Sequence, residues 1–220
     1  MTFLSDLGPE RTDALIGRGR RVRFRPAAGV FHEGDRSGRV AVVLAGRVKI
    51  SSFTQEGREI VLAIRGPGEL LGELSAIDGE PHGSTATAME PAELLLVHAD
   101  EFREFLVREP QVALLLLEML SRRLRDADRK RVEFGSIDTV GRVAGRLVEL
   151  AETYGEGGGE EGGEVRIDLP LSQLELAGWI GASREAVSKA LRALRSRGWV
   201  ETRRLGITIL DLESLRRRAT

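Results

Sequence analysis

The feature that most constrains the fold of this chain is a series of short runs of strand character between residues 20 and 98. Four runs are rich in β-branched residues, and a fifth closes the region: they cover residues 20–24, 40–44, 47–51, 59–64 and 92–97. Turns containing glycine separate them, since glycine adopts the positive φ angles that tight turns require. Regularly spaced short strands of this kind predict an antiparallel sandwich or barrel.

Residues 110–134 have a different pattern, because they contain no proline or glycine after Pro110 and strongly favour helix. One stripe at spacings of four and three consists of Ala113, Leu117, Leu120, Leu124, Ala127, Arg131 and Phe134. A helix of about 24 residues is roughly 36 Å long, which is more than a domain of this size needs to cover itself. We therefore expect a seam between two copies of the chain, the alternative being a helix that covers its own domain. Gly135 is expected to end this helix.

Composition excludes several classes of site. The chain of 220 residues contains no cysteine, which excludes disulfides, thiolate catalysis and iron–sulfur or zinc sites held by cysteine. The first residues lack a signal-peptide pattern and no apolar run approaches the length of a membrane span. We therefore expect a cytoplasmic protein that does not enter the membrane.

The segment after the long helix predicts a second domain. Asp138 can cap a helix that runs to about Tyr154. Residues 155–164 contain only glycine and glutamate and are expected to form a flexible acidic loop.

The most specific signal lies between Leu171 and Leu194. Ser172 and Glu175 have the spacing of a capping box at the start of a short helix. Gly181 permits a sharp turn, and Ser183 can cap a second helix from Arg184 to about Arg195. Two short helices joined by a turn with glycine predict a helix-turn-helix.

The second of these helices carries side chains that suit the reading of DNA bases. Arg184 can donate two hydrogen bonds to guanine, Glu185 can accept one from cytosine, and Lys189 can reach guanine or a phosphate. Two predicted strands follow, joined as a hairpin with Arg203 and Arg204 at its tip, as in a winged helix-turn-helix. These arginines are expected to contact phosphates. Residues 165–220 hold 11 Arg and Lys against 6 Asp and Glu, which suits a partner rich in phosphate. The predicted DNA-binding residues are Ser172, Ser183, Arg184, Glu185, Ser188, Lys189, Arg203 and Arg204.

Four features in this order give the chain a resemblance to a known family: the strands with His32-Glu33-Gly34-Asp35, the segment Gly68 to Ala88, the long helix, and the segment Ala182 to Lys189. With them the chain resembles the cyclic-AMP receptor/fumarate-nitrate regulator (CRP/FNR) family of bacterial transcription factors. The resemblance implies an α+β fold with an N-terminal β-roll of the cyclic-nucleotide-binding jelly-roll type, a long dimerisation helix and a C-terminal winged helix-turn-helix. The implied divisions are residues 1–109, 110–137 and 138–220. It also implies a homodimer that binds a near-palindromic site on double-stranded DNA, with RNA polymerase as a candidate further partner.

The same resemblance places an effector site in the β-roll. Its implied residues are Gly72, Glu73, Leu74, His82, Gly83, Ser84, Thr85, Ala127 and Asp128. Relatives that bind cyclic nucleotides neutralise the phosphate with an arginine, and this position falls on His82, while their base-binding positions fall on Ala127 and Asp128. We therefore do not expect cyclic AMP to be the effector. A different small molecule, no effector at all, or a cyclic nucleotide bound through His82 remain alternatives.

Two other classes of function fit the sequence less well. No nucleotide-binding Gly-x-x-x-x-Gly-Lys, nucleophile elbow or metal triad is present, so the sequence does not favour an enzyme or a metal site. A sensor module that regulates a partner protein without binding DNA would need neither the base-reading helix nor the basic hairpin. DNA binding is therefore the favoured function.

Overall fold

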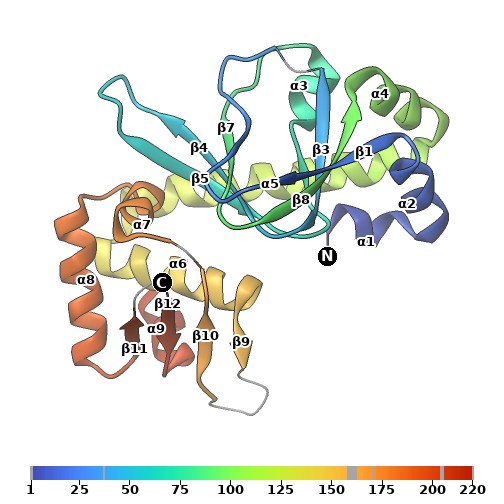
Figure 1. Ribbon diagram of the computed structural model, residues 1–220. Coiled ribbons are helices and arrows are strands. Elements are labelled where there is room, and N and C mark those ends of the chain that lie inside the picture. The colour runs from blue at the N-terminus through green and yellow to red at the C-terminus, as the bar shows by residue number, and fades with distance from the viewer. Residues whose placement is uncertain (1, 37, 158–162, 170, 204–205, 220) are drawn as a thin grey trace. The chain divides into compact units, whose positions relative to one another are not determined.

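The computed structural model describes residues 2–36, 38–157, 163–169, 171–203 and 206–219 (Figure 1). The chain forms two compact units. The N-terminal unit comprises Met1–Gly57 and Val61–Asp126, and the C-terminal unit comprises Arg58–Ile60 and Ala127–Thr220. The three divisions expected from the sequence stay a prediction.

Two four-stranded sheets form the N-terminal unit. One has the order β1 (Gly19–Phe24), β8 (Ala92–His98), β3 (Arg39–Ala45) and β6 (Leu70–Leu71), and the other β2 (Gly29–Phe31), β7 (Thr85–Ala88), β4 (Val48–Phe53) and β5 (Glu59–Arg65). Neighbours pair antiparallel, as in β3 with β8, where Val42 lies opposite Leu95. The expected antiparallel strands are thus confirmed.

Strand β3 shows how the core is divided. Its side chains alternate between two faces, as the period of a β-strand requires. Val40 and Val42 pack in a cluster with helical residues such as Phe102, whereas Ala41 and Val43 pack in a second cluster between the two sheets. Because all four are buried, β3 is a central strand covered on both faces.

Among its described residues, five helices begin in the N-terminal unit: α1 (Phe3–Leu7), α2 (Pro9–Ile16), α3 (Glu73–Asp78), α4 (Ala99–Arg108) and α5 (Pro110–Ser136). The expectation that Gly135 ends α5 is wrong, because the helix continues to Ser136. The backbone N–H of Ile137 still donates to the carbonyl of Glu133 at 3.0 Å, so helical bonding passes through the glycine. Glycine disfavours a helix by only about 1 kcal/mol, which neighbouring turns can offset.

The C-terminal unit combines helices with a small sheet. Its helices are α6 (Thr139–Tyr154), α7 (Gln173–Ile180), α8 (Arg184–Ser196) and α9 (Leu212–Ala219), and its strands β9 (Glu156–Gly157), β10 (Val165–Ile167), β11 (Val200–Arg203) and β12 (Gly206–Ile209) follow the sheet order β11-β12-β10-β9. Asp138 caps α6 as expected, since its carboxylate accepts from the N–H of Gly141 at 2.8 Å.

Two expectations about these regions can be compared with the structure. Residues 155–164 were expected to form an acidic loop, but Glu156–Gly157 form strand β9. Residues 158–162 of this segment lie outside the described residues. Across the described residues, none of the helices combines the length and the apolar character needed to cross a membrane.

Candidate nucleic-acid interface and effector site

The helix-turn-helix begins at a capping box. The hydroxyl of Ser172 accepts from the N–H of Glu175 at 3.1 Å, and the carboxylate of Glu175 accepts from the N–H of Ser172 at 2.9 Å. These two bonds satisfy backbone donors that the first turn of α7 would otherwise leave open. Ser172 is exposed, so its role as a DNA contact stays a prediction beside its capping role.

The turn between α7 and α8 depends on Gly181 and Ser183. Gly181 has φ 67° and ψ 43°, a left-handed conformation that glycine adopts without strain. Ser183 caps α8, because its hydroxyl accepts from the N–H of Ala186 at 3.1 Å. The predicted helix-turn-helix is thus present, and its second helix starts at Arg184 as expected.

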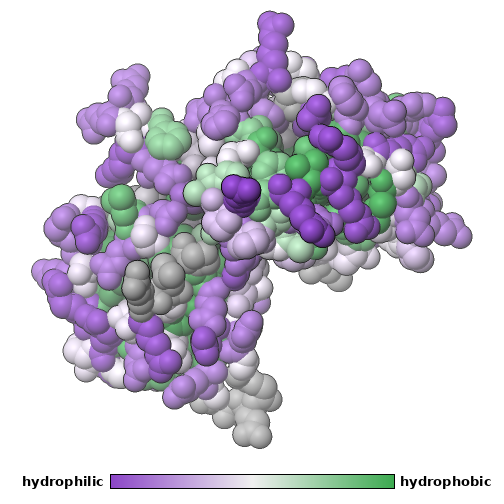
Figure 2. All heavy atoms as spheres, viewed as in Figure 1, coloured by the Kyte–Doolittle hydropathy of each residue, from purple (hydrophilic) through white to green (hydrophobic). Residues whose placement is uncertain are grey.

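Helix α8 has one buried and one exposed face. Val187, Ala190, Leu191 and Leu194 are buried, whereas Ala186 is half-buried. Figure 2 shows hydrophilic residues along the edge of the C-terminal unit that α8 forms in Figure 1. The buried face fixes the orientation of the helix and leaves its polar face accessible.

The exposed face carries the residues that the sequence singled out for base contacts. Arg184, Glu185 and Lys189 are exposed, and Ser188 is half-buried and accepts from Arg192 at 3.1 Å. The pKa of Glu185 lies below its usual range, because its carboxylate accepts a hydrogen bond from its own backbone N–H and a second from the Ser183 hydroxyl. Glu185 therefore stays ionised near neutral pH and is an acceptor only.

The hairpin after α8 forms the wing. Strands β11 and β12 pair antiparallel with Thr202 opposite Ile207. Arg203 is exposed and lies 3.7 Å from Glu201, while Arg204 lies outside the described residues. Arg195 of α8 donates to the hydroxyl of Thr202 at 2.9 Å and so links the helix to the wing.

Sequence reasoning missed two further cations on α8. Arg192 and Arg195 are both exposed, and they continue the stripe that runs through Arg184 and Ser188 at helical spacing. That spacing was the signal that could have found them. They extend the positive face of the helix beyond its first two turns.

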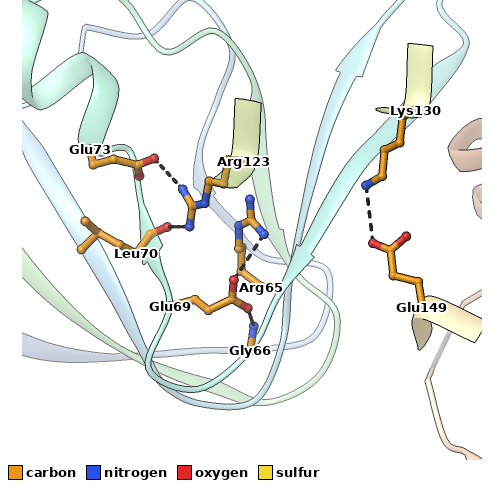
Figure 3. A network of polar contacts seen from close by, with 8 residues as sticks. All are labelled: Arg65, Gly66, Glu69, Leu70, Glu73, Arg123, Lys130 and Glu149. Atoms are coloured by element: carbon orange, nitrogen blue, oxygen red, sulfur yellow. Dashed lines mark hydrogen bonds and ion pairs between the residues drawn. The ribbon is translucent and has the colours of Figure 1, made fainter. Parts of the chain in front are cut away.

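The effector site expected in the N-terminal unit contains an ion pair that the sequence did not predict. Gly72 is left-handed at φ 73° and starts α3, which places Glu73 with only 5% of its surface exposed. Arg123 of α5 donates to the Glu73 carboxylate at 2.6 Å and to the Leu70 carbonyl at 3.0 Å (Figure 3). The carboxylate implied to bind a ligand is therefore already paired.

The surroundings of Arg123 form a wider network. Arg65 donates to Glu69 at 3.2 Å, and Glu69 also accepts from the N–H of Gly66 at 2.7 Å (Figure 3). Burial lowers the pKa of Arg123, and Glu73 opposes that shift. Because arginine stays protonated in proteins, the result is a retained cation at this site.

His82 lies against the same segment. Its ring stacks on Phe31 with centroids 3.9 Å apart and planes at 12°, and 5% of the residue is exposed. A Cβ atom placed on Gly72 would come within 3.0 Å of the His82 ring, so the structure brings these two predicted residues together. Burial lowers the pKa of His82, although Asp35 raises it, so the imidazole is neutral at pH 7.

The other predicted effector residues differ in environment. Thr85 is buried and its hydroxyl accepts from the N–H of Glu33 at 3.0 Å, whereas Ser84 is half-buried and Gly83 exposed. Leu74 is 57% exposed. Ala127 and Asp128 are exposed residues of the C-terminal unit, so their assignment to the effector site stays a prediction.

Comparison with known proteins agrees with both halves of this description. The cyclic nucleotide-binding domain matches residues 21–109, and the Crp-like helix-turn-helix domain matches residues 141–218. The CRP-like cAMP-activated global transcriptional regulator of Mycobacterium tuberculosis is 36% identical over 211 residues, covering 96% of this chain and 93% of that protein. The chain belongs to the CRP/FNR family of transcription regulators.

Other members of the CRP/FNR family match over most of their length. The Cyclic AMP receptor protein of Thermus thermophilus is 34% identical over 197 residues, covering 88% of this chain and 85% of that protein. The structure of FixK2 from Bradyrhizobium japonicum shares the fold, with a TM-score of 0.80, 23% identity and coverage of 92% of this chain and 98% of that one. This CRP/FNR protein is thus a DNA-binding transcription regulator with a cyclic nucleotide-binding domain.

Proposed function

We propose that this regulator binds DNA as a homodimer and recognises a near-palindromic operator through α8. The observation that carries the proposal is the exposed face of α8, on which two cations and an ionised carboxylate lie within its first two turns. Arg184 and Lys189 suit guanine, and Glu185 suits the amino group of cytosine. Ser172, Ser183, Arg203 and Arg204 are proposed to contact the sugar-phosphate backbone, which fixes the register of the helix.

The proposed dimer interface lies on α5. Leu117 and Leu124 of the predicted seam are 58% and 63% exposed, and Phe134 is 48% exposed. Large apolar side chains in a row on one helix are covered in most proteins, and a second copy of α5 would cover them in a coiled coil. Leu117→Asp should therefore give a monomer in sedimentation measurements. Val107→Asp, at an apolar residue of α4 that is 79% exposed, is the matched control and should remain dimeric.

Selection of binding sites from random double-stranded DNA tests the operator. The full chain should enrich a near-palindrome whose two halves lie about one helical turn, or 34 Å, apart. The Arg184→Ala variant should enrich a different or weaker sequence. Failure of the wild-type chain to enrich any sequence at low salt would contradict the proposal.

For the effector site we infer that cyclic AMP is not the natural ligand and that another small molecule, or none, occupies this domain. Support comes from His82, which is neutral, buried and stacked at the position implied for the phosphate-binding arginine. A hydrogen bond to a charged group is worth about 1.5–3 kcal/mol, so its loss weakens binding roughly ten- to a hundredfold. The Mycobacterium tuberculosis relative is named as activated by cAMP, so this is a proposed difference within the family.

A substitution that restores the cation tests this inference. Titration calorimetry should show weak binding of cyclic AMP and cyclic GMP to the wild-type chain, and His82→Arg should strengthen cyclic AMP binding about tenfold or more. His98→Arg, at an exposed histidine, is the matched control and should leave the affinity unchanged. Tight cyclic-nucleotide binding by the wild-type chain would instead support the alternative in which His82 serves in place of arginine.

A further inference from the structure

A small cavity in the C-terminal unit is lined by residues other than those proposed to bind DNA or an effector. Its lining comes from the end of α5, from α6 and from α7, and consists of Lys130, Glu133, Phe134, Arg142, Arg146, Trp179 and Ile180. Its volume is about 10 Å³, the size that holds one ordered water or one monatomic ion.

Three hydrogen-bond donors of the lining residues lack an acceptor. The Nε atoms of Arg142 and Arg146 and the Nε1 atom of Trp179 are buried and have no partner among the described residues. Arg146 and Trp179 are 7% and 5% exposed, so bulk water does not readily reach them. A buried donor without an acceptor costs about 1–3 kcal/mol, and such groups in native proteins usually have a bound species. All three atoms can only donate, which favours a species that only accepts.

The charges around the cavity point the same way. Glu149, which lies outside the lining, pairs with both Lys130, at 3.4 Å, and Arg146, and Glu133 is the one carboxylate among the described lining residues. The described lining therefore holds three cations and one carboxylate, and two further carboxylates lie near it, Glu149 beside Arg146 and Asp138 beside Arg142. The guanidinium groups are further held in place by aromatic rings, Arg146 at 4.7 Å from the centre of Trp179 and Arg142 at 5.4 Å from that of Phe134.

We propose that this cavity binds one small monovalent anion of the halide class. The anion accepts hydrogen bonds from the unpaired N–H groups of Arg142, Arg146 and Trp179. It would replace the missing acceptors and add a negative charge beside the lining's three cations. Burial disfavours the charged form of Arg146 and lowers its pKa, and an adjacent anion offsets this cost. Because the lining comes from three helices, the anion fastens the end of α5 to α6 and α7.

Bromide identifies the site directly, because it scatters X-rays anomalously and water does not. Crystals of the full chain grown or soaked in sodium bromide should show an anomalous peak bounded by Arg142, Arg146 and Trp179. An ordered water there without an anomalous signal would overturn the proposal.

Thermal unfolding in solution provides the second measurement. The melting temperature of the C-terminal unit is compared in 0.15 M sodium chloride and in 0.15 M sodium gluconate, whose anion is too large for the cavity. At half or greater occupancy, chloride should raise the wild-type midpoint by about 2 °C or more relative to gluconate. The Trp179→Phe variant removes one donor and should lose most of this difference.

The matched control is Trp199→Phe, since Trp199 also stacks with an arginine, Arg197 at 5.3 Å, but does not line the cavity. This variant should keep the chloride effect. An equal response to the two salts in wild type and Trp179→Phe would overturn the proposal. An anomalous bromide peak without any effect of chloride on the melting temperature would show an adventitious ion only, and would also overturn the proposal.

Discussion

Replacing Gly181 by alanine tests whether the turn of the helix-turn-helix is held by the end of α5. Gly181 is left-handed, and a Cβ atom added there would lie 2.1 Å from the ring of Phe134. Gly198 is also left-handed, at φ 71°, but a Cβ atom there meets nothing within 4 Å. The two glycines therefore share the backbone strain and differ in the steric overlap.

The expected magnitudes follow from these two contributions. The left-handed conformation costs alanine about 1–2 kcal/mol, and Gly198→Ala should lose about that much stability. At Gly181 the ring of Phe134 must also swing out. Within one copy of the chain it would give up about 1 kcal/mol of apolar burial, since the residue is 48% exposed there, and about 0.5–1 kcal/mol of its contact with Arg142. Gly181→Ala should thus cost about 2.5–4 kcal/mol.

A double-mutant cycle separates the overlap from the strain. Urea unfolding can be followed by tryptophan fluorescence, because Trp179 and Trp199 both lie in the C-terminal unit. In a Phe134→Ala background, Gly181→Ala should cost only the 1–2 kcal/mol of strain. If Gly181→Ala costs the same in both backgrounds, the contact between Phe134 and the turn does not contribute to stability and the reasoning fails.

Three further predictions follow from the described contacts. Arg123→Met should destabilise the N-terminal unit by about 3 kcal/mol in circular dichroism melts, because it leaves the Glu73 carboxylate buried and unpaired. Adding Glu73→Gln should recover part of the lost stability. A loss below about 1 kcal/mol for Arg123→Met would contradict the prediction. Ser183→Ala should cost about 1 kcal/mol in urea unfolding through loss of the α8 cap, and an unchanged midpoint would mean that the cap is not needed. Since burial lowers the pKa of His82, the unfolded chain binds the proton more readily, so stability should fall as the pH drops below about 6.5. His82→Gln should remove that part of the pH dependence, and identical pH profiles would refute it.

Local chemistry explains why the C-terminal unit could be predicted so closely from the sequence. The caps at Asp138, Ser172 and Ser183 each depend on residues three positions apart, and all three occur as predicted. The two faces of α8 likewise follow from spacing within one helix. Such features need no knowledge of the rest of the fold.

The effector region was less predictable because its contacts join residues far apart in the chain. The pair between Glu73 and Arg123 spans 50 residues, and the stacking of His82 on Phe31 joins a loop to the end of strand β2. Neither has a local signature. The end of α5 was misjudged for a related reason, since glycine alone is a weak helix terminator and Gly135 is tolerated inside the helix.

The central claim, that α8 reads DNA sequence, is tested most directly by fluorescence anisotropy with the selected operator and a scrambled duplex of equal length. For Arg184→Ala we predict a loss of affinity for the operator of about 5- to 150-fold, with little change for the scrambled duplex. Arg108→Ala, at an exposed arginine of α4, should change neither. An Arg184→Ala variant that binds the operator as tightly as wild type, or that weakens on both duplexes equally, would contradict the assignment of α8 as the base-reading helix.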